Sequence, residues 1–137
     1  HRYSSAASDV YKRQIGEGAS GGALGIGLCD KMIMLENTWF SVISPEGCAS
    51  ILWKDSSKAP EAAKSLKLTP KDLMEHNICN MIVYEPSGGA HRHFDATADI
   101  LKETILSEIK ELQNNLSSDF LESRVSRYDK LGVFRED

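Results

Sequence analysis

A glycine-rich segment carries the residues of this chain that are best suited to chemistry. Residues 15–30 read IGEGASGGALGIGLCD and hold six of the chain's ten glycines. Consecutive glycines at the start of a helix expose peptide N–H groups that have no intrahelical acceptor, and such donors can hold an anion. Two of them aimed at a developing enolate oxygen would form an oxyanion hole, where losing one donor costs ~3 to 4 kcal/mol of barrier. The segment therefore favours a site made of backbone.

The glycines allow two further interpretations at this point. Glycines also let a helix and a strand pack closely, which is the commoner reason for an isolated glycine-rich loop. The run from Gly16 to Gly21 fits the dinucleotide-binding pattern G-x-G-x-x-G, with Glu36 as the acidic residue expected ~20 positions later. In a dinucleotide-binding fold a second complete helical crossover would follow the strand near Glu36. The sequence has an aromatic, extended segment there instead, which weakens the dinucleotide interpretation. No Gly-Lys-Ser/Thr sequence follows, which excludes a Walker loop.

The elements that would position this loop are short strands alternating with helices. We expect a loop that includes Gly16, Gly18, Gly21 and Gly22, followed by a thin helix over 23–29. Buried strands are predicted at 31–35 and 80–86, and an extended segment at 38–43. Ser44-Pro45, Pro60 and Thr69-Pro70 each predict a helix start, with ends near 53, 66 and 76. Strands separated by helices predict an α/β fold with parallel pairing.

The C-terminal third of the chain has the pattern of a helical arm. Apolar residues recur at helical spacing at Ala98, Leu101, Ile105, Ile109, Leu112 and Leu116. This stripe is typical of an amphipathic helix, for which Asp95 is the expected cap. A last helix over about 118–131 should end at Gly132. We therefore divide the chain into a disordered or non-native leader (1–14), a domain (15–93) and a helical arm (94–137).

Composition excludes several classes of protein. The chain has 16 Lys and Arg against 20 Asp and Glu, a net charge of −4, so it lacks the basic excess that nucleic-acid binding needs. No apolar run approaches the ~18 to 20 residues of a membrane span, and no signal peptide is evident. Cys29, Cys48 and Cys79 are too far apart for a metal-binding pair. We therefore expect a cytoplasmic protein with reduced cysteines, no metal site and neither nucleic acid nor membrane as a partner.

Several long motifs together resemble a known enzyme family. They are IGEGASGGALGIGLCDKMIMLENTWFSVISPEGCASILWKDSSKAPEAA (15–63), MIVYEPSGGAHR (81–92) and the helical tail ending in Arg127-Tyr128. In this order they closely resemble the carboxyltransferase alpha subunit of bacterial acetyl-CoA carboxylase. The resemblance covers the chain after residue 14, and it identifies the chain as a C-terminal portion of such a subunit.

The resemblance implies both a fold and a reaction. The fold would be that of the ClpP/crotonase superfamily, a spiral core of stacked ββα units, here partial and with a C-terminal helical arm. The reaction would transfer a carboxyl group from carboxybiotin on a carrier protein to acetyl-CoA, giving malonyl-CoA for fatty-acid biosynthesis. The freed biotin nitrogen would accept the proton, so a Ser-His-Asp or Cys-His arrangement is not needed.

The resemblance also implies partners and site residues. The partners would be the carboxyltransferase beta subunit, in an alpha2beta2 heterotetramer, the biotin carboxyl carrier protein and biotin carboxylase. Zinc is expected only in the beta subunit, and no cofactor is expected to be bound covalently by this chain. The Gly21-Gly22 peptide would supply the oxyanion-hole N–H, while Gly18, Ala19 and Ser20 would shape the substrate-binding loop. Arg92 is a weaker candidate, because its guanidinium could hold an anion but a surface charge is the commoner explanation.

Two alternative functions remain from the sequence. Glu46 could act as the acid or base of a crotonase-type enoyl-CoA hydratase, although an acid in a first helical turn more often serves the helix dipole. The chain could also be a non-catalytic assembly module. As a portion of a subunit, it is expected to be inactive alone.

Overall fold

The computed structural model describes residues 16–115 and 119–132. The expected leader (1–14), Leu116, the first residue of the predicted last helix and the final five residues of the arm lie outside the described residues. In chain order the elements are β1 (Glu17–Ala19), α1 (Ser20–Gly27), β2 (Ile33–Leu35), β3 (Trp39–Ser41), α2 (Pro45–Trp53), η2 (Ser56–Lys58), α3 (Ala59–Leu66), α4 (Pro70–Glu75), β4 (Met81–Val83), α5 (Phe94–Asn114) and α6 (Phe120–Asp129).

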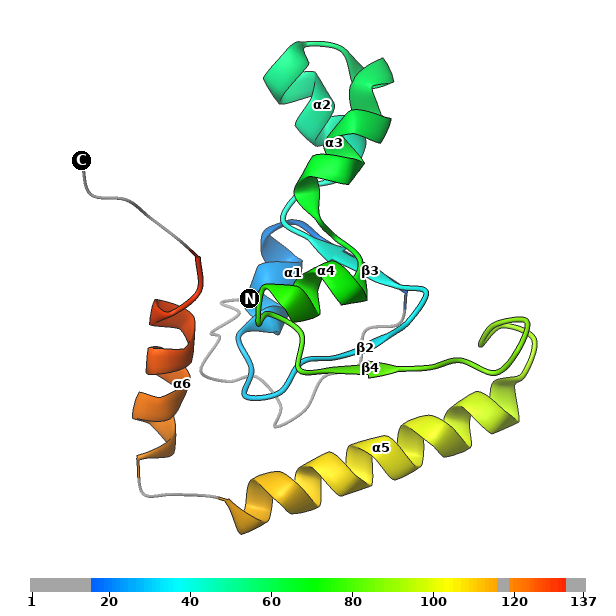
Figure 1. Ribbon diagram of the computed structural model, residues 1–137, viewed down its shortest axis with the longest axis vertical. Helices are drawn as coiled ribbons and strands as arrows, with labels where there is room; N and C mark the ends of the chain where they lie inside the picture. The colour runs from blue at the N-terminus through cyan, green and yellow to red at the C-terminus, as the bar shows by residue number, and fades with distance from the viewer. Residues whose placement is uncertain (1–15, 116–118, 133–137) are drawn as a thin grey trace, which may run out of the picture.

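Two pairs of parallel strands make up the sheet structure of the described residues. In the first pair β1 lies beside β3, with Gly18 opposite Phe40. In the second pair β2 lies beside β4, with Met34 opposite Ile82. Figure 1 shows α5 running along the β2–β4 pair, while α2 and α3 project from the strands as a helical pair. The mixture of helices and parallel strands confirms the predicted α/β class, whereas the repeated ββα spiral stays a prediction.

The described core is small. Met34, Leu73 and Cys79 form its buried centre, and partly buried apolar side chains surround them: Met32, Phe40, Ile78 and Ile82. No large side chain of the described residues is fully buried. None of the described helices combines the length and the apolar sequence that crossing a bilayer requires.

The predicted helix starts at the proline positions are confirmed. Ser44 caps α2, and its Oγ accepts a hydrogen bond of 3.2 Å from the amide nitrogen of Gly47. Thr69 and Asp72 form a reciprocal capping box at the start of α4. Pro60 lies at the start of α3, and α2, α3 and α4 end within one residue of the predicted positions. For α2 and α4 a polar cap next to a proline encodes the helix start locally, whereas α3 has the proline without a side-chain cap.

The predicted glycine loop is wrong in its boundaries. Gly18 lies within β1, and α1 starts at Ser20, three residues before the predicted start, so Gly21 and Gly22 belong to its first turn. The helix ends at Gly27 rather than at Cys29. The reason is pairing with β3, which holds residues 17–19 extended although their sequence, Glu-Gly-Ala, has no strand preference.

Helix α5 also differs from its prediction. It begins at Phe94, so Asp95 lies in the first turn instead of capping it, and no side chain caps this helix end. Ala98 is exposed, while Thr97 and Glu108 are buried. The other described members of the expected stripe, Leu101, Ile105, Ile109 and Leu112, are partly buried, and the pairing of Glu108 with Lys31 makes burial of its carboxylate tolerable.

Candidate functional site

The turn from β1 into α1 presents an uncapped helix start. Ala19 is extended (φ −137°, ψ 161°) and serves as N-cap, but no side chain of the described residues accepts a hydrogen bond from the first turn. The first turn also contains no acidic residue. Peptide N–H groups at this position lack intrahelical acceptors, and they lie at the positive end of the helix dipole. The turn can therefore donate to an anion.

The space beside Gly21 and Gly22 is open. Both residues are exposed, and a Cβ built on either one meets no described atom within 4 Å. Gly27 is different, since a Cβ there would lie 3.0 Å from Cζ of Phe40 and 3.3 Å from Cε of Met32. Close packing therefore explains Gly27 but does not explain Gly21-Gly22.

The same turn lies at an edge suited to ligand binding. In the parallel register Ala19 is opposite Ser41, the last residue of β3. Hence α1 and the segment leading into α2 leave the same, carboxyl edge of this strand pair. Ligands of parallel sheets bind outside the carboxyl ends of the strands.

Ser20 has a backbone conformation that sequence reasoning missed. Its φ is +72°, in the left-handed region that favours glycine, although it is a serine. The run Gly18-Ala19-Ser20-Gly21-Gly22 also fits the pattern G-x-S-x-G, which in strand–turn–helix context can expose a nucleophilic serine. No histidine among the described residues hydrogen-bonds to Ser20, so the base that such a nucleophile needs is not supplied by them. The pattern was readable from the sequence.

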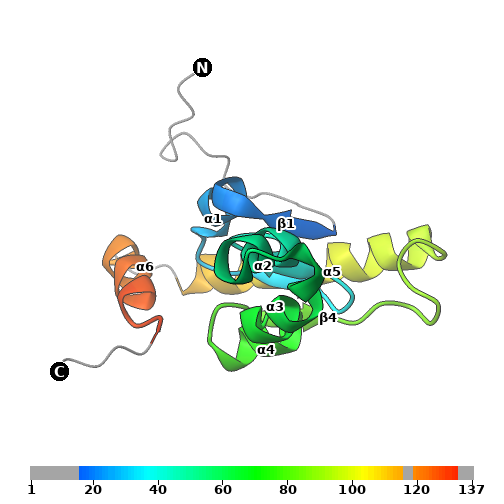
Figure 2. The same ribbon diagram turned by 90° about the horizontal axis from the view of Figure 1, so that it is seen from above.

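The structure brings together some of the predicted site residues and separates others. Gly18, Ala19, Ser20, Gly21 and Gly22 form one continuous strand-to-helix turn, with Gly18 buried and Ser20 exposed. Arg92 is exposed in the loop before α5, where its amide nitrogen donates to the carbonyl oxygen of Gly89 at 3.1 Å. Figures 1 and 2 show this loop at the far end of β4, away from α1. Arg92 thus does not join the glycine turn within this chain.

Glu46 lies in the first turn of α2 and is exposed. Its carbonyl oxygen accepts a hydrogen bond of 2.8 Å from the hydroxyl of Ser50. A carboxylate at this position stabilises the positive end of the helix dipole.

The described residues contain no group of three or more His, Cys, Asp and Glu side chains that could hold a metal ion. Cys29, Cys48 and Cys79 are free thiols. Burial raises the pKa of Cys29 and of Cys79 above the usual value of a thiol. These two cysteines are therefore poor nucleophiles at neutral pH.

Comparisons with known proteins agree on one family. A family model described as acetyl co-enzyme A carboxylase carboxyltransferase-like matches residues 7–132, starting within the residues that the sequence analysis set apart as a leader. Three relatives carry the name acetyl-coenzyme A carboxylase carboxyl transferase subunit alpha. One from Thermus thermophilus is 47% identical over 122 residues (89% of this chain, 39% of the relative). That of Chlorobium limicola is 48% identical over 122 residues (89% and 37%), and one from Desulfitobacterium hafniense is 52% identical over 125 residues (89% and 38%). The chain spans about two fifths of the length of these curated relatives.

Proposed function

The chain belongs to the acetyl co-enzyme A carboxylase carboxyltransferase-like family, and we propose that it is a C-terminal portion of an alpha subunit that transfers a carboxyl group to acetyl-CoA. Carboxybiotin on a carrier protein would supply the carboxyl group, and malonyl-CoA for fatty-acid biosynthesis would be the product. The names of the relatives support this proposal.

The observation that carries the proposal is the open, uncapped start of α1. Removing a proton from the acetyl methyl group places negative charge on the thioester oxygen as an enolate. The peptide N–H groups of Gly21 and Gly22 would donate to this oxygen, while Gly18, Ala19 and Ser20 hold the turn in shape. Because the donors are backbone groups fixed before the reaction, they stabilise charge without reorganising.

Exposed apolar side chains support action within a larger assembly. Leu24 on α1 is 47% exposed, and Ile51 and Leu52 on α2 are 69% and 67% exposed. Exposed apolar side chains on these two helices are available for contact with other protein in such an assembly. The partners in this proposal are the beta subunit, in an alpha2beta2 heterotetramer and carrying the zinc, the biotin carboxyl carrier protein and biotin carboxylase, all in the cytoplasm. Within that assembly these strands and helices would complete the ββα spiral of a crotonase-like core.

The test compares two substitutions of one residue in the complete alpha subunit. Gly22→Pro deletes the N–H, whereas Gly22→Ala keeps it and adds a Cβ that meets no described atom within 4 Å. With the beta subunit and carboxybiotinylated carrier, we expect malonyl-CoA formation to fall ~100-fold or more for Gly22→Pro and to change less than about threefold for Gly22→Ala. Size-exclusion chromatography checks that both variants assemble. Unchanged turnover by an assembled Gly22→Pro complex would refute the role of this peptide.

The same material separates the alternative functions. Hydration of crotonyl-CoA that disappears in Glu46→Gln would favour a hydratase. A wild-type complex that assembles but forms no malonyl-CoA would favour a non-catalytic assembly module.

A further inference from the structure

The last described helix, α6, reaches back to the C-terminal end of α1. The hydroxyl oxygen of Tyr128 accepts a hydrogen bond of 2.7 Å from the amide nitrogen of Cys29. The same hydroxyl lies 2.8 Å from the carbonyl oxygens of both Gly27 and Cys29, to one of which it can donate its single hydrogen at a time. The Tyr128 side chain thus contacts both an amide N–H group and carbonyl oxygens of the backbone at the end of α1.

Arg127 extends this contact to the segments that precede β2 and β4. Its Nη1 donates to the carbonyl oxygens of Cys29 (3.0 Å) and Asp30 (2.6 Å). Its Nη2 donates to the carbonyl oxygen of Ile78 (3.0 Å) and to Oδ1 of Asn80 (2.8 Å). One guanidinium therefore ties the segment that enters β2 to the segment that enters β4.

Arg124, one turn earlier on α6, pairs side-on with the carboxylate of Asp30. Its Nε donates to Oδ1 at 2.7 Å, and its Nη2 contacts Oδ2. A two-point pair of this kind fixes orientation as well as distance. We call Arg124, Arg127 and Tyr128 together the α6 clamp.

Helix α1 lacks a C-terminal cap of its own, which gives the α6 clamp a physical reason. Leu28 follows the helix with φ −72° and ψ 81° rather than in the left-handed conformation of a glycine cap, and the last turn has no basic residue. The clamp supplies a donor for the carbonyl oxygen of Gly27, the last residue of the helix, further donors for the carbonyl oxygens of Cys29 and Asp30 just beyond it, and positive charge near the negative end of the helix dipole. The contact is also partly buried, and this burial raises the pKa of both Cys29 and Tyr128.

We propose that Tyr128 and Arg127 are positioning residues, which hold α1 so that the peptide donors at its other end stay aligned for carboxyl transfer. The inference rests on the proposed function of Gly21 and Gly22. Helix α1 has eight residues and is about 12 Å long, so a shift of its end at Gly27 would be passed through two turns of helix backbone to the first turn. A misplacement of ~1 Å can lower an enzymatic rate about 100-fold.

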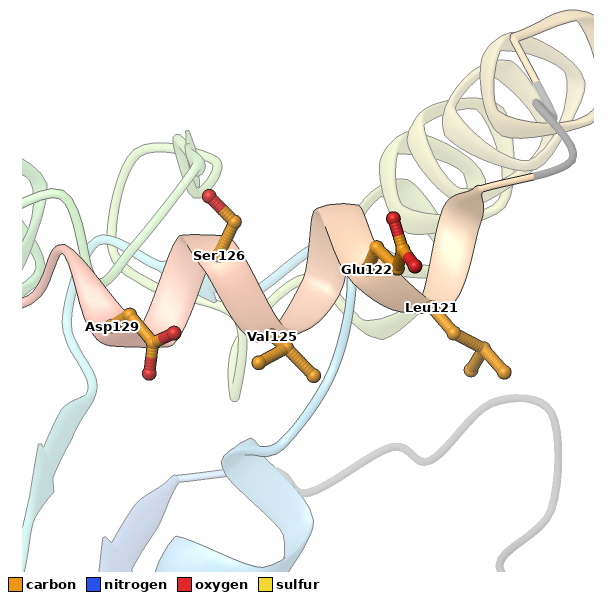
Figure 3. A pocket seen from close by; sticks show the side chains of 5 residues that line it. All are labelled: Leu121, Glu122, Val125, Ser126 and Asp129. Carbon is orange, nitrogen blue, oxygen red and sulfur yellow. The ribbon is translucent and has the colours of Figure 1, made fainter.

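The outer side of α6 does not take part in the clamp. Figure 3 shows Leu121, Glu122, Val125, Ser126 and Asp129 along α6, where they line a shallow, open hollow of about 310 Å³. Leu121 and Val125 are more than half exposed. The helix therefore uses one face for α1 and leaves the other to solvent or to protein outside the described residues.

The test uses Tyr128→Phe and Arg127→Lys in the complete alpha subunit, assembled with its beta subunit. Tyr84→Phe is the matched control, because Tyr84 is 65% exposed and loses the same hydroxyl. We expect kcat for malonyl-CoA formation to fall at least tenfold in both clamp variants, with KM for acetyl-CoA changed less than twofold. Lower thermal stability with an unchanged kcat per assembled complex would overturn the positioning role.

Hydrogen–deuterium exchange supplies a readout that does not depend on activity. In Tyr128→Phe we expect amides of residues 23–29 to exchange at least tenfold faster, while those of α2 and the Tyr84→Phe control stay at the wild-type rate. Unchanged exchange over 23–29 would overturn the inference even if malonyl-CoA formation falls. If the wild-type complex forms no malonyl-CoA, the proposed function is wrong, and the proposed role of the α6 clamp in carboxyl transfer is wrong as well. The exchange data would then show only whether α6 holds α1 in place.

Discussion

The ammonium nitrogen of Lys31 lies 2.9 Å from Oε2 of Glu108, and this ion pair joins the segment before β2 to the middle of α5. The side chain of Glu108 is 9% exposed, and Lys31 also lies 3.3 Å from Oε1 of Glu111. The contact with Glu108 is the main reason that the pKa of Lys31 is raised above its usual value. It is therefore the polar anchor of an otherwise loosely packed helix.

Lys31→Met is expected to lower the free energy of unfolding by about 2 kcal/mol, because it leaves the carboxylate of Glu108 buried without a partner. This is less than the about 3 to 5 kcal/mol of a fully buried pair, since the side chain of Lys31 is 27% exposed to screening water. Urea denaturation of the purified protein measures the change. Lys102→Met, at an exposed position of α5, is the control, and an equal effect of both substitutions would contradict the anchoring role.

Glu85 should make the protein's stability depend on pH in the acid range. Its Oε2 accepts a hydrogen bond of 2.7 Å from the amide nitrogen of Ala90, the largest of the interactions that lower the pKa of Glu85. Because the pKa of Glu85 is lower in the folded protein than the value of ~4.3 in the unfolded chain, the ionised side chain adds to the free energy of unfolding. This stabilisation is fully present above the unfolded pKa and is lost as the pH falls through the folded pKa. Glu85→Gln should therefore lower stability at pH 7 but not near pH 2.

Urea titrations of the wild type and the variant at several pH values measure this difference. Glu103→Gln, at an exposed position of α5, controls for the loss of a surface charge. A difference between wild type and Glu85→Gln that stays constant from pH 7 to pH 2 would exclude this linkage.

Two glycines of α1 should respond to substitution with opposite signs. A Cβ at Gly25 meets no described atom within 4 Å, so Gly25→Ala should stabilise the helix by about 0.5 to 1 kcal/mol. Gly27→Val should destabilise by about 1 to 3 kcal/mol, because its side chain would overlap Phe40 and Met32. Thermal unfolding followed by circular dichroism measures both. Similar shifts for both variants would show that packing at Gly27 is less tight than the distances indicate.

Ser20→Gly should relieve backbone strain without removing a donor. A non-glycine residue in the left-handed region destabilises the folded state by about 1 to 2 kcal/mol. Glycine removes this strain, but it also raises the conformational entropy of the unfolded chain, which offsets part of the gain. We expect a net gain of about 0.5 to 1 kcal/mol and retained malonyl-CoA formation in the complete complex. Ser65→Gly, at an exposed position within α3, should instead destabilise. Loss of turnover in Ser20→Gly together with Ser20→Ala would indicate that the hydroxyl itself takes part in the reaction.

Elements encoded by neighbouring residues could be predicted from the sequence. Ser44-Pro45 and Thr69-Pro70 place a polar cap beside a proline, and α2 and α4 begin there. The start of α1 was predicted three residues late, because β1 is set by pairing of Glu17 with Trp39, 22 positions away. Local preference cannot report such a partner.

The same distinction between local and distant determinants applies to the candidate site. The position of Gly21 and Gly22 at the entry to a helix could be predicted, since it depends on neighbouring residues, and their role as donors stays a proposal. The contacts of Arg127 and Tyr128 could not, because their partners around Cys29 lie about 100 positions earlier. The spacing of Arg124, Arg127 and Tyr128 places them on one helix face but does not identify the surface that this face meets.

The separation of Cys29 and Tyr128 along the chain also orders events during synthesis. At about 5 to 20 residues per second, the ribosome needs about 5 to 20 s to add the 99 residues from one to the other. Through that interval the segment of α1 is present without the hydroxyl that contacts the carbonyl oxygen of Gly27, so the alignment that we propose for this helix can be completed only after α6 has been translated. Nonsense mutations between the codons for Cys29 and Arg127 should accordingly yield products in which the glycine turn is present in sequence but unsupported in space.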